Sequence, residues 1–489
     1  MKAGFTHWLL SAARRVPESI ALECEERSWT YSQLFTASFL LSRKLKSRGI
    51  SSGSRVAIIS QNSPAQVIAI HAVTLLNCVV TPINHRFSHE ELKANLSLID
   101  PELVVYDDTL ELSSLSTVNT ESLPLSSVEL FPRKTVEWPE VNLPSDSTGV
   151  IFLTSGTTGT PKAVSLTWWN LASSAIASAL NLGVDENDKW LTVLPLDHMG
   201  GFSILIRSAI YGTAVVLHRK FDASRAMHSI QSDDITMASL VPTMLRRLLN
   251  QGLSGENDLR AALIGGGPAT QDLLEAAIEK GIPVCPTYGM TETSSQLTTL
   301  SKGEVKSRLG SSGKPLPMMQ VKIIDRDGVK KETGQTGEIA VRGPNVTSGY
   351  LDATETNEGR LKNGWLLTGD YGYVDSDGYL YPVGRREDRI VSGGENISPA
   401  EVESVYRAHP AIQDICVFGI PDPEWDEIVV GAVILNNPEK NSVADLLKIR
   451  FENLAGFKHP KKLFTVKELP RTASGKVKRS SLRDRFSPE

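Results

Sequence analysis

The stretch from Ile151 to Val164, IFLTSGTTGTPKAV, constrains the fold of this chain more than any other. It opens with apolar residues typical of a buried strand, and small residues follow: Thr154, Ser155, Gly156, Thr157, Thr158 and Gly159. Small hydroxyl residues and glycines let backbone N–H groups converge on a phosphate, because no bulky side chains stand in the way. Lys162 adds a point charge for the outer phosphates. The stretch therefore predicts a phosphate-binding loop, and an ordinary turn between two strands is the alternative.

Two common nucleotide-binding loops are excluded by their spacing. A Walker A loop needs a Gly-Lys-Ser/Thr triplet, whereas Lys162 follows a proline and precedes Ala163. The three glycines at 265–267 do not make a dinucleotide fingerprint either, because Thr270 stands where the last glycine should be. The loop therefore belongs to another family of nucleotide-using proteins.

The length of 489 residues predicts two or more domains, because one hydrophobic core does not grow to that size. A net charge of −5 argues against nucleic-acid binding, which favours a basic excess. The N-terminus reads as an amphipathic helix ended by Pro17, without a secretory signal, and 67–83 reads as a buried helix and strand. The scattered cysteines have no metal-ligand spacing and suggest a reduced, cytoplasmic protein; they are Cys24, Cys78, Cys285 and Cys416.

The order of helical and strand patterns predicts an α/β protein. Residues 20–110 alternate strands and helices, with Thr30 or Ser32 as the cap of the first long helix, which predicts a largely parallel sheet covered on both sides. After Lys162 we expect strands to deliver His198 (from a strand at 190–196), 265–267 and 288–292 at their carboxyl ends, where ligands bind in such sheets. From about 305 the segments become short and β-rich, and a compact α/β unit begins after Arg386.

Five ordered stretches identify a family resemblance: TSGTTGTPKAV, YGMTE (288–292), TGD (368–370), GRREDRIVSGGENISPAEVE (384–403) and LPRTASGK (469–476). They resemble the adenylate-forming superfamily of acyl-CoA synthetases, luciferase and the adenylation domains of peptide synthetases. The resemblance implies a large N-terminal domain of stacked, parallel-rich α/β sheets over 1–386, with a β-rich subdomain at about 305–386. It also implies a small, mobile α/β domain over 387–489.

The resemblance also implies the reaction and its small molecules. A carboxylate is a poor acylating agent, so these enzymes first make a mixed anhydride with the AMP part of ATP, and a thiol such as that of CoA then displaces AMP. Positioning and charge neutralisation at the α-phosphate dominate such a step. ATP, Mg²⁺ and CoA are therefore the expected co-substrates and cofactor.

The family's catalytic residues match positions in this chain. Lys476 would bridge the attacking carboxylate and the α-phosphate, although a solvated lysine in a basic tail is the alternative. Glu292 would hold Mg²⁺, which usually takes one or two carboxylates beside phosphate oxygens. Thr291 would donate to the α-phosphate, and Tyr288 would stack on adenine.

The remaining nucleotide and CoA contacts rest on the resemblance. Asp370 would bind the ribose hydroxyls with Arg385, and Gly265, Gly266 and Gly267 would let adenine lie against bare backbone. Glu387 falls at the hinge of the mobile domain, where Glu is a mild departure from the family. Gly393 and Gly394 would line the pantetheine tunnel.

The acid pocket is expected around His198, Arg207 and Gly289. The stretch from 178 to 223 resembles the branch of the superfamily whose acid is 2-succinylbenzoate, a dicarboxylate of menaquinone biosynthesis. His198 would be a wall between acyl pocket and thiol tunnel, with an open face at the glycines that follow it. Asp197 replaces an aromatic residue of the family and suits an anionic substrate only if it points outward. Arg207 would anchor the benzoate carboxylate, and an arginine pointing to solvent is the alternative.

Several alternatives stay open from sequence. Another aryl or medium-chain acid could be the substrate, and a neutral acyl chain would not need Arg207. A free-standing adenylation protein that loads a separate carrier is a second alternative, whereas a luciferase-like oxygenase or an adenylate-binding scaffold is less supported. No membrane segment is expected, and a homodimer or higher homo-oligomer is left open.

Overall fold

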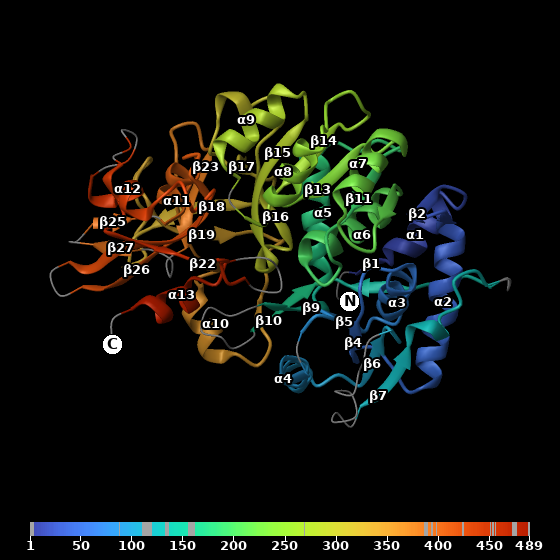
Figure 1. The fold of residues 1–489 in the computed structure, drawn as a ribbon. Helices are drawn as coiled ribbons and strands as arrows, with labels where there is room; N and C mark the ends of the chain where they lie inside the picture. Colours follow the sequence, from blue (N-terminus) through green and yellow to red (C-terminus); the bar gives the residue numbers. More distant parts are fainter. Residues whose placement is uncertain are drawn as a thin grey trace. The chain divides into compact units, whose positions relative to one another are not determined.

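The computed structural model describes residues 4–87, 89–109, 120–132, 136–154, 162–267, 269–385, 390–392, 395–397, 399–422, 425–449, 451, 454, 456–471 and 477–487 (Figure 1). The chain forms two compact units. The first comprises Met1–Val321, Val341–Leu367 and Gly378–Leu380, and the second comprises Lys322–Ala340, Thr368–Asp377 and Tyr381–Glu489. The boundary expected between residues 386 and 387 stays a prediction.

A seven-stranded sheet of the first unit carries the end of the expected phosphate loop. Its order is β20 (Gly349–Tyr350), β10 (Lys162–Thr167), β9 (Thr148–Thr154), β5 (Val79–Ile83), β4 (Arg55–Ile59), β6 (Leu103–Tyr106) and β7 (Glu121–Pro124). The strands from β9 to β7 pair in parallel, whereas β10 pairs antiparallel with both β9 and β20. Helices α3 (Pro64–Leu75) and α4 (His89–Ile99) connect its parallel strands. The expected βαβ arrangement is confirmed.

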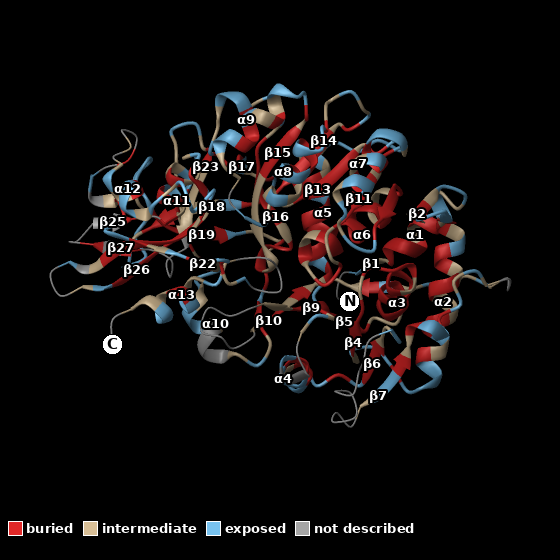
Figure 2. Cartoon of the chain, in the orientation of Figure 1, coloured by how far each residue is buried: buried red, intermediate tan, exposed pale blue. Residues whose placement is uncertain are grey.

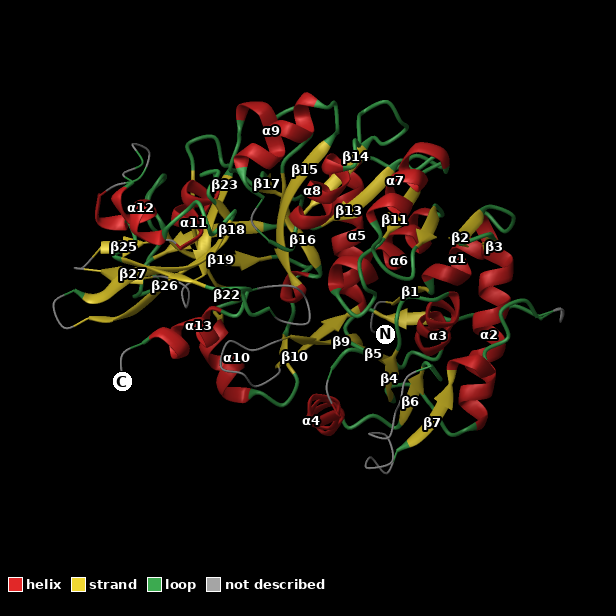
Figure 3. Ribbon diagram, in the orientation of Figure 1, coloured by secondary structure: helices red, strands yellow, loops and turns green. Residues whose placement is uncertain are grey.

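A nine-stranded sheet of the same unit carries the acid-pocket residues. Its order is β17 (Lys314–Pro315), β16 (Ser295–Thr299), β15 (Val284–Met290), β14 (Ala261–Ile264), β13 (Met237–Leu240), β11 (Lys189–Thr192), β12 (Ala214–Leu217), β2 (Ile20–Cys24) and β3 (Arg27–Thr30). The strands from β15 to β2 are parallel, and the outer pairs are antiparallel. Its helices are α1 (Trp8–Arg15), α2 (Tyr31–Ser47), α5 (Trp168–Leu182), α6 (Met199–Tyr211), α7 (Ala223–Ser232), α8 (Pro242–Asn250) and α9 (Gln271–Glu279). Figure 3 shows how helices and strands alternate.

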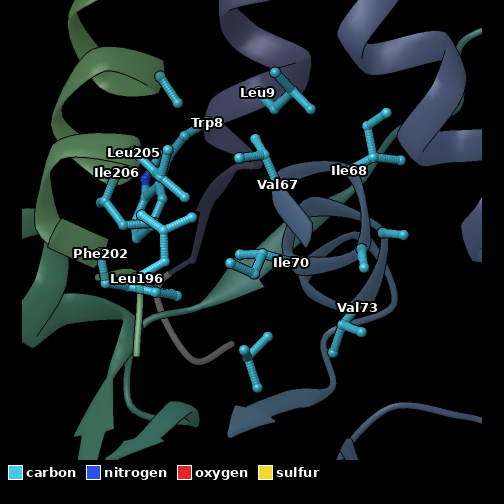
Figure 4. Packing of buried hydrophobic residues seen from close by; sticks show 14 of the residues in the cluster. Trp8, Leu9, Val67, Ile68, Ile70, Val73, Leu196, Phe202, Leu205 and Ile206 are labelled. Carbon is cyan, nitrogen blue, oxygen red and sulfur yellow. The ribbon is translucent and has the colours of Figure 1, made fainter. Parts of the chain in front are cut away.

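One hydrophobic core lies between these two sheets. Buried side chains of α1, α2, α3, α5 and α6 form a single cluster with residues of both sheets. Figure 2 shows the buried residues concentrated in these helices and strands, and Figure 4 shows side chains of α1, α3 and α6 meeting, among them Trp8, Val67 and Leu205. Because α6 is packed against several elements at once, nearly all of its residues are buried. A charged side chain on α6 is therefore shielded from water.

The second unit contains most of one sheet and all of another. The first has the order β18 (Gln320–Ile324), β19 (Gly337–Arg342), β22 (Trp365–Val374) and β21 (Leu361–Lys362), with β23 (Leu380–Arg385) on β22. The other has the order β25 (Glu395–Ile397), β24 (Ile390–Ser392), β27 (Asp426–Leu435) and β26 (Ile412–Asp422), with β28 (Lys462–Thr465) on β27. Helices α11 (Pro399–Arg407), α12 (Val443–Lys448) and α13 (Arg479–Phe486) belong to this part of the chain. A short pair, β1 (Gly4–Thr6) and β8 (Asn142–Pro144), lies in the first unit.

Local sequence signals set several boundaries. Thr30 caps α2 as predicted, because its hydroxyl accepts from the N–H of Gln33 at 3.2 Å while the Gln33 side chain accepts from Thr30 N–H at 2.9 Å. Such a capping box contributes about 1 kcal/mol. The strand expected over 190–196 is shorter than predicted and ends at Thr192. Pro195 has no N–H to donate to a neighbouring strand. The side chain of Asn62, which follows β4 of the seven-stranded sheet, forms hydrogen bonds with Leu194 and Leu196 on either side of it.

Candidate active site

The loop between β11 and α6 is held by the side chain of Asn62, which follows β4. Its Nδ2 donates to the carbonyls of Leu194 at 3.0 Å and His218 at 3.1 Å, and its Oδ1 accepts from the N–H of Leu196 at 2.9 Å. Asn62 is 3% exposed, so these bonds are shielded from water. The buried amide of Asn62 therefore fixes the loop that carries Asp197 and His198. No sequence motif identifies Asn62 for this role.

His198 caps the N-terminus of α6 and is half-exposed. Its Nε2 is buried without a hydrogen-bond partner and lies 3.8 Å from Asp197 Oδ2. From sequence, Asp197 suited an anionic acid only if it pointed outward. In the structure its side chain is buried, with 5% exposed, so that condition is not met. Burial lowers the pKa of His85, and the charge of Asp197 partly opposes that shift.

The open face expected at Gly200 and Gly201 is filled by the protein itself. A Cβ on Gly201 would lie 2.4 Å from the carbonyl oxygen of Pro195, and one on Gly200 would lie 3.1 Å from the side chain of Leu194. The glycines therefore let the first turn of α6 pack against its own loop. The prediction of an open face for the acyl group is wrong at these two residues.

Arg207 lies in the middle of α6 and is 1% exposed, which excludes the alternative of an arginine pointing to solvent. Among the residues that the structure describes, none is a hydrogen-bond partner of its Nε or Nη2, and its guanidinium carbon lies 5.5 Å from the centre of the Trp190 ring. Burial lowers the pKa of Arg207, because the charged form has lost its water. A buried cation with two unpaired donors is costly unless an anion reaches it.

Arg207 lines a narrow pocket that, in this structure, is too small to admit a water molecule. Residues of α5 and α6 line it, and its polar groups include Ser174, Ser203 and Ser294. Ser174 Oγ donates to the carbonyl of Ser294 at 2.6 Å, so the pocket wall is tied to the segment that follows Glu292. The pocket therefore joins a buried positive charge to the stretch that carries the expected metal ligand.

Glu292 lies in a 3₁₀ turn, Thr291–Thr293, and is 6% exposed. Its Oε1 accepts a hydrogen bond from Tyr350 Oη at 2.8 Å and lies 3.7 Å from Arg360 Nη1. Arg360 Nη1 also donates to Tyr350 Oη at 3.1 Å. The other oxygen, Oε2, accepts no hydrogen bond from any residue in the described parts of the chain. A carboxylate held by one oxygen, with the other available, fits a monodentate ligand of Mg²⁺.

The end of the phosphate loop lies near this carboxylate. Thr154 and Lys162 pair across the antiparallel strands β9 and β10, and Thr154 Oγ1 donates to the carbonyl of Lys162 at 3.3 Å. Lys162 Nζ lies 5.9 Å from the centre of the Tyr350 ring. Lys162, Tyr350 and Glu292 are thus brought together, although Lys162 lies 188 residues from Tyr350 and 130 residues from Glu292 in sequence. Tyr350 and Arg360 carry no motif that would have identified them.

Gly265 and Gly266 of the expected adenine site and Gly289 of the expected acid pocket occupy positions that disfavour a side chain, whereas a Cβ on Gly267 would meet nothing within 4 Å. A Cβ on Gly265 would lie 2.8 Å from Thr287 Cγ2, Gly266 has φ +75°, and a Cβ on Gly289 would lie 1.8 Å from the carbonyl oxygen of Ser295. The strand β15 ends at Met290, so Tyr288 lies in the carboxyl-terminal part of the strand. The antiparallel partner β16 extends the strand by two further residue pairs beyond Tyr288.

Several predicted residues cannot be placed in this site. Asp370 lies in β22 within the second unit, is 9% exposed, and its N–H donates to Thr368 Oγ1 at 3.0 Å. Outside the described residues lie Ser155, Gly156, Thr157, Thr158, Gly159, Glu387, Gly393, Gly394 and Lys476, as does the side chain of Arg385. Their roles stay predictions.

Two negative findings apply to the described ranges only. They contain no group of three or more His, Cys, Asp or Glu side chains that could hold a metal ion by themselves. Within the same ranges, none of the helices has the length and apolar character needed to cross a membrane.

Comparison with known proteins gives full-length matches. A family model described as AMP-binding enzyme matches residues 9–351, and one described as AMP-binding enzyme C-terminal domain matches 401–476. The chain is 41% identical to 2-succinylbenzoate–CoA ligase of Bacillus subtilis (strain 168), over 98% of this chain and 97% of the relative. It is 40% identical to the enzyme of the same name from Bacillus velezensis, over 98% and 97%.

Solved structures agree with these matches. The o-succinylbenzoate CoA synthetase (MenE) from Bacillus subtilis in complex with the acyl-adenylate intermediate OSB-AMP has a TM-score of 0.93 at 40% identity, with 100% of both chains covered. The same enzyme in complex with ATP and a magnesium ion has a TM-score of 0.91 at 40% identity, covering 99% of this chain and 100% of that chain. The predicted α/β fold class is confirmed.

Proposed function

This chain belongs to the family of AMP-binding enzymes, and we propose that it joins 2-succinylbenzoate to coenzyme A with the energy of ATP. It is an AMP-forming acid–thiol ligase. The acid is first activated as its acyl-adenylate with release of pyrophosphate, and the thiol of CoA then displaces AMP to give 2-succinylbenzoyl-CoA. This reaction belongs to menaquinone biosynthesis.

The observation that carries the choice of acid is the buried guanidinium of Arg207. The substrate has two carboxylates: the succinyl group is activated, and the benzoate group needs an anchor. Arg207 offers Nε–H and Nη2–H, both buried and unpaired, beside the pocket between α5 and α6. Charge-assisted hydrogen bonds from arginine to a carboxylate are about twice as strong as neutral ones. A neutral acyl chain would leave this buried charge uncompensated, so the pocket favours an acid with a second anionic group.

The nucleotide would be held mainly by residues at the ends of strands. The loop after β9 and Lys162 would bind the phosphates, Thr291 would donate to the α-phosphate, and Tyr288 would stack on adenine beside 265–267. Asp370 and Arg385 would bind the ribose. Glu292 would hold Mg²⁺, for which its available Oε2 is suited. The ion neutralises phosphate charge when bound.

Removal of charge repulsion is the main chemical task in the first step, because an anionic carboxylate attacks an anionic phosphate. Lys162 supplies positive charge next to the phosphate loop, and we infer that Lys476 supplies it between the two reacting groups. In the second step Glu387 would act as the hinge of a mobile domain over 387–489, and Gly393 and Gly394 would leave room for pantetheine. His198 and Gly289 would border the acyl group.

The location of the protein is inferred from its cysteines. The four free cysteines are all buried, which agrees with a reduced compartment, and we propose the cytoplasm. A homodimer or higher homo-oligomer stays open. The surface on which to test it is the exposed side of α5, where Trp169, Ile176 and Leu180 are all apolar.

The function is tested with a panel of carboxylic acids, each with ATP, Mg²⁺ and CoA, while pyrophosphate and thioester are measured together. We expect 2-succinylbenzoate to give the highest kcat/KM and equal amounts of both products. Benzoylpropionate, which lacks the ring carboxylate, is the matched control and should be used far less well. Equal use of the two acids would contradict the proposed anchor, and no pyrophosphate with any acid would contradict the function.

A further inference from the structure

The carboxylate of Glu292 is held by a chain of two side chains that the expected mechanism does not use. Arg360, at the end of α10 (Thr354–Arg360), donates to the hydroxyl oxygen of Tyr350 at 3.1 Å, and Tyr350 donates to Glu292 Oε1 at 2.8 Å. The Tyr350 hydroxyl has one proton, so the direction of this chain is fixed: Arg360 to Tyr350 to Glu292. Glu292 Oε1 is therefore satisfied, and negative charge remains available on Oε2.

Tyr350 is itself fixed on both sides. It is 4% exposed, and β20 pairs with β10 so that Tyr350 lies opposite Val164, two residues after Lys162. Its backbone N–H donates to Asn357 Oδ1 at 2.8 Å, and Asn357 Nδ2 donates to the Tyr350 carbonyl at 3.0 Å. The hydroxyl therefore sits at one place relative to the strand that leaves the phosphate loop.

The backbone of Glu292 is tied to the same segment. The N–H of Thr347 donates to the Glu292 carbonyl at 2.8 Å, and Thr347 Oγ1 donates to the carbonyl of Ser165 in β10. Both the main chain and the side chain of Glu292 thus depend on residues 347–360. The carboxylate of Glu292 is therefore already oriented before a cation binds. A carboxylate free to rotate would first have to lose that freedom.

We propose that Tyr350 and Arg360 are positioning residues for the divalent cation: Tyr350 orients Glu292 so that Oε2 faces the cation, and Arg360 polarises the Tyr350 hydroxyl. The proposal rests on the proposed function, since it takes Glu292 as the metal ligand.

Loss of Tyr350 and loss of Arg360 should change cation binding in opposite directions, for different physical reasons. Tyr350 contributes orientation without net charge, so its loss should weaken cation binding. Arg360 carries a positive charge 3.7 Å from Glu292 Oε1, so it opposes a divalent cation on the same carboxylate while it favours the phosphates of ATP. Tyr350→Phe and Arg360→Met should therefore change cation affinity in different directions.

The test measures Mn²⁺ binding directly by electron paramagnetic resonance, with α,β-methylene-ATP as a nucleotide that cannot be cleaved at the α-phosphate. We expect Tyr350→Phe to weaken Mn²⁺ binding about 10- to 100-fold, the usual effect of removing a partner of a metal ligand. Arg360→Met should bind Mn²⁺ at least as tightly as the parent, and should bind the metal-free nucleotide more weakly.

A matched control exists in the same unit. Tyr379 donates its hydroxyl to the carboxylate of Glu304 and is 5% exposed, so Tyr379→Phe removes a similar bond elsewhere and should leave Mn²⁺ binding unchanged. Urea unfolding of both phenylalanine variants separates a loss of folding from a loss of orientation. Parent-like Mn²⁺ affinity in Tyr350→Phe would overturn the proposal.

Glu292→Gln distinguishes this failure from a failure of the proposed function. If that variant also binds Mn²⁺ like the parent, Glu292 is not the cation ligand and the positioning role is overturned with it. The panel of acids described above would still decide whether the chain is the ligase, because it is run on the parent protein.

Discussion

Replacing Arg207 by methionine should stabilise the free protein and weaken its use of the acid. Methionine keeps much of the length of arginine without its charge, so it can fill the same space between α5 and α6. In the free protein the guanidinium is 1% exposed with two unpaired donors. Each unsatisfied buried donor costs about 1 to 3 kcal/mol, and the Trp190 ring at 5.5 Å offsets about 1 kcal/mol of this. We therefore expect Arg207→Met to raise the free energy of unfolding by about 1 to 5 kcal/mol.

The same substitution should be costly once the acid binds. Loss of one partner of a buried, hydrogen-bonded charge pair costs about 2 to 5 kcal/mol. At 1.4 kcal/mol for each factor of ten, kcat/KM for 2-succinylbenzoate should fall at least roughly 30-fold. The KM for ATP should stay close to that of the parent, because Arg207 lines the pocket between α5 and α6.

Arg260 provides a matched control, because it is an arginine whose donors are paired. It binds Asp188 through Nε at 2.7 Å and Nη2 at 2.5 Å, and it donates to the carbonyl of Leu182 at 2.6 Å. The attached carboxylate of Asp188 is 6% exposed, so Arg260→Met should lower the free energy of unfolding by about 3 kcal/mol. Its KM for the acid should be nearly unchanged.

Urea unfolding of the two free variants, followed by steady-state kinetics with the acid and with ATP, measures both effects. The opposite signs of the two stability changes are the central expectation. If Arg207→Met destabilised the free protein as Arg260→Met does, and the KM for 2-succinylbenzoate did not change, the guanidinium would be a structural residue and not the anchor.

Three further predictions address other parts of the chain. Asn62→Ala should lower the free energy of unfolding by about 2 to 3 kcal/mol, since it leaves buried backbone groups of the His198 loop unpaired. It should also lower kcat/KM for the acid. Urea unfolding and steady-state kinetics measure the two effects, and unchanged kinetics would show that the loop keeps its conformation without Asn62. Burial lowers the pKa of His7 to about 3 and of His71 to about 4, so the unfolded state binds more protons below pH 6.5, and stability should fall by about 1.4 kcal/mol per pH unit for each histidine as the pH drops from 6.5 towards 4. A flat urea midpoint over that range would contradict their burial as neutral groups. Lys476→Ala should abolish pyrophosphate release while largely sparing thioester formation from supplied acyl-adenylate, and equal loss of both steps would contradict its assigned role.

Much of the fold could be predicted from short stretches of sequence. The cap at Thr30, the proline that begins α3 at Pro64, and the strand before the phosphate loop all depend on residues within a few positions of each other. Local hydrogen bonds and side-chain periodicity need no distant partner, so these signals are complete in the sequence. The motifs that identify the family are of the same kind, because each loop shapes its own contact with the nucleotide.

The candidate site was only partly predictable, because its geometry depends on residues that are distant in sequence. Periodicity on α6 cannot tell whether Arg207 faces water, since only packing against α1, α5 and both sheets removes every exposed side of that helix. The register of β20 on β10 decides that the Tyr350 hydroxyl reaches Glu292 from 58 residues away.

The sequence by itself determined which residues could bind a nucleotide and activate an acid. The tertiary structure decided which of these side chains are buried and which are oriented by hydrogen bonds. It ended a strand at Thr192 through an amide that lies 132 residues from Leu194 in sequence, and it buried the side chain of Asp197. The reason is physical: burial and hydrogen-bond geometry are properties of surfaces brought together by folding, and no local pattern of residues encodes which surfaces will meet.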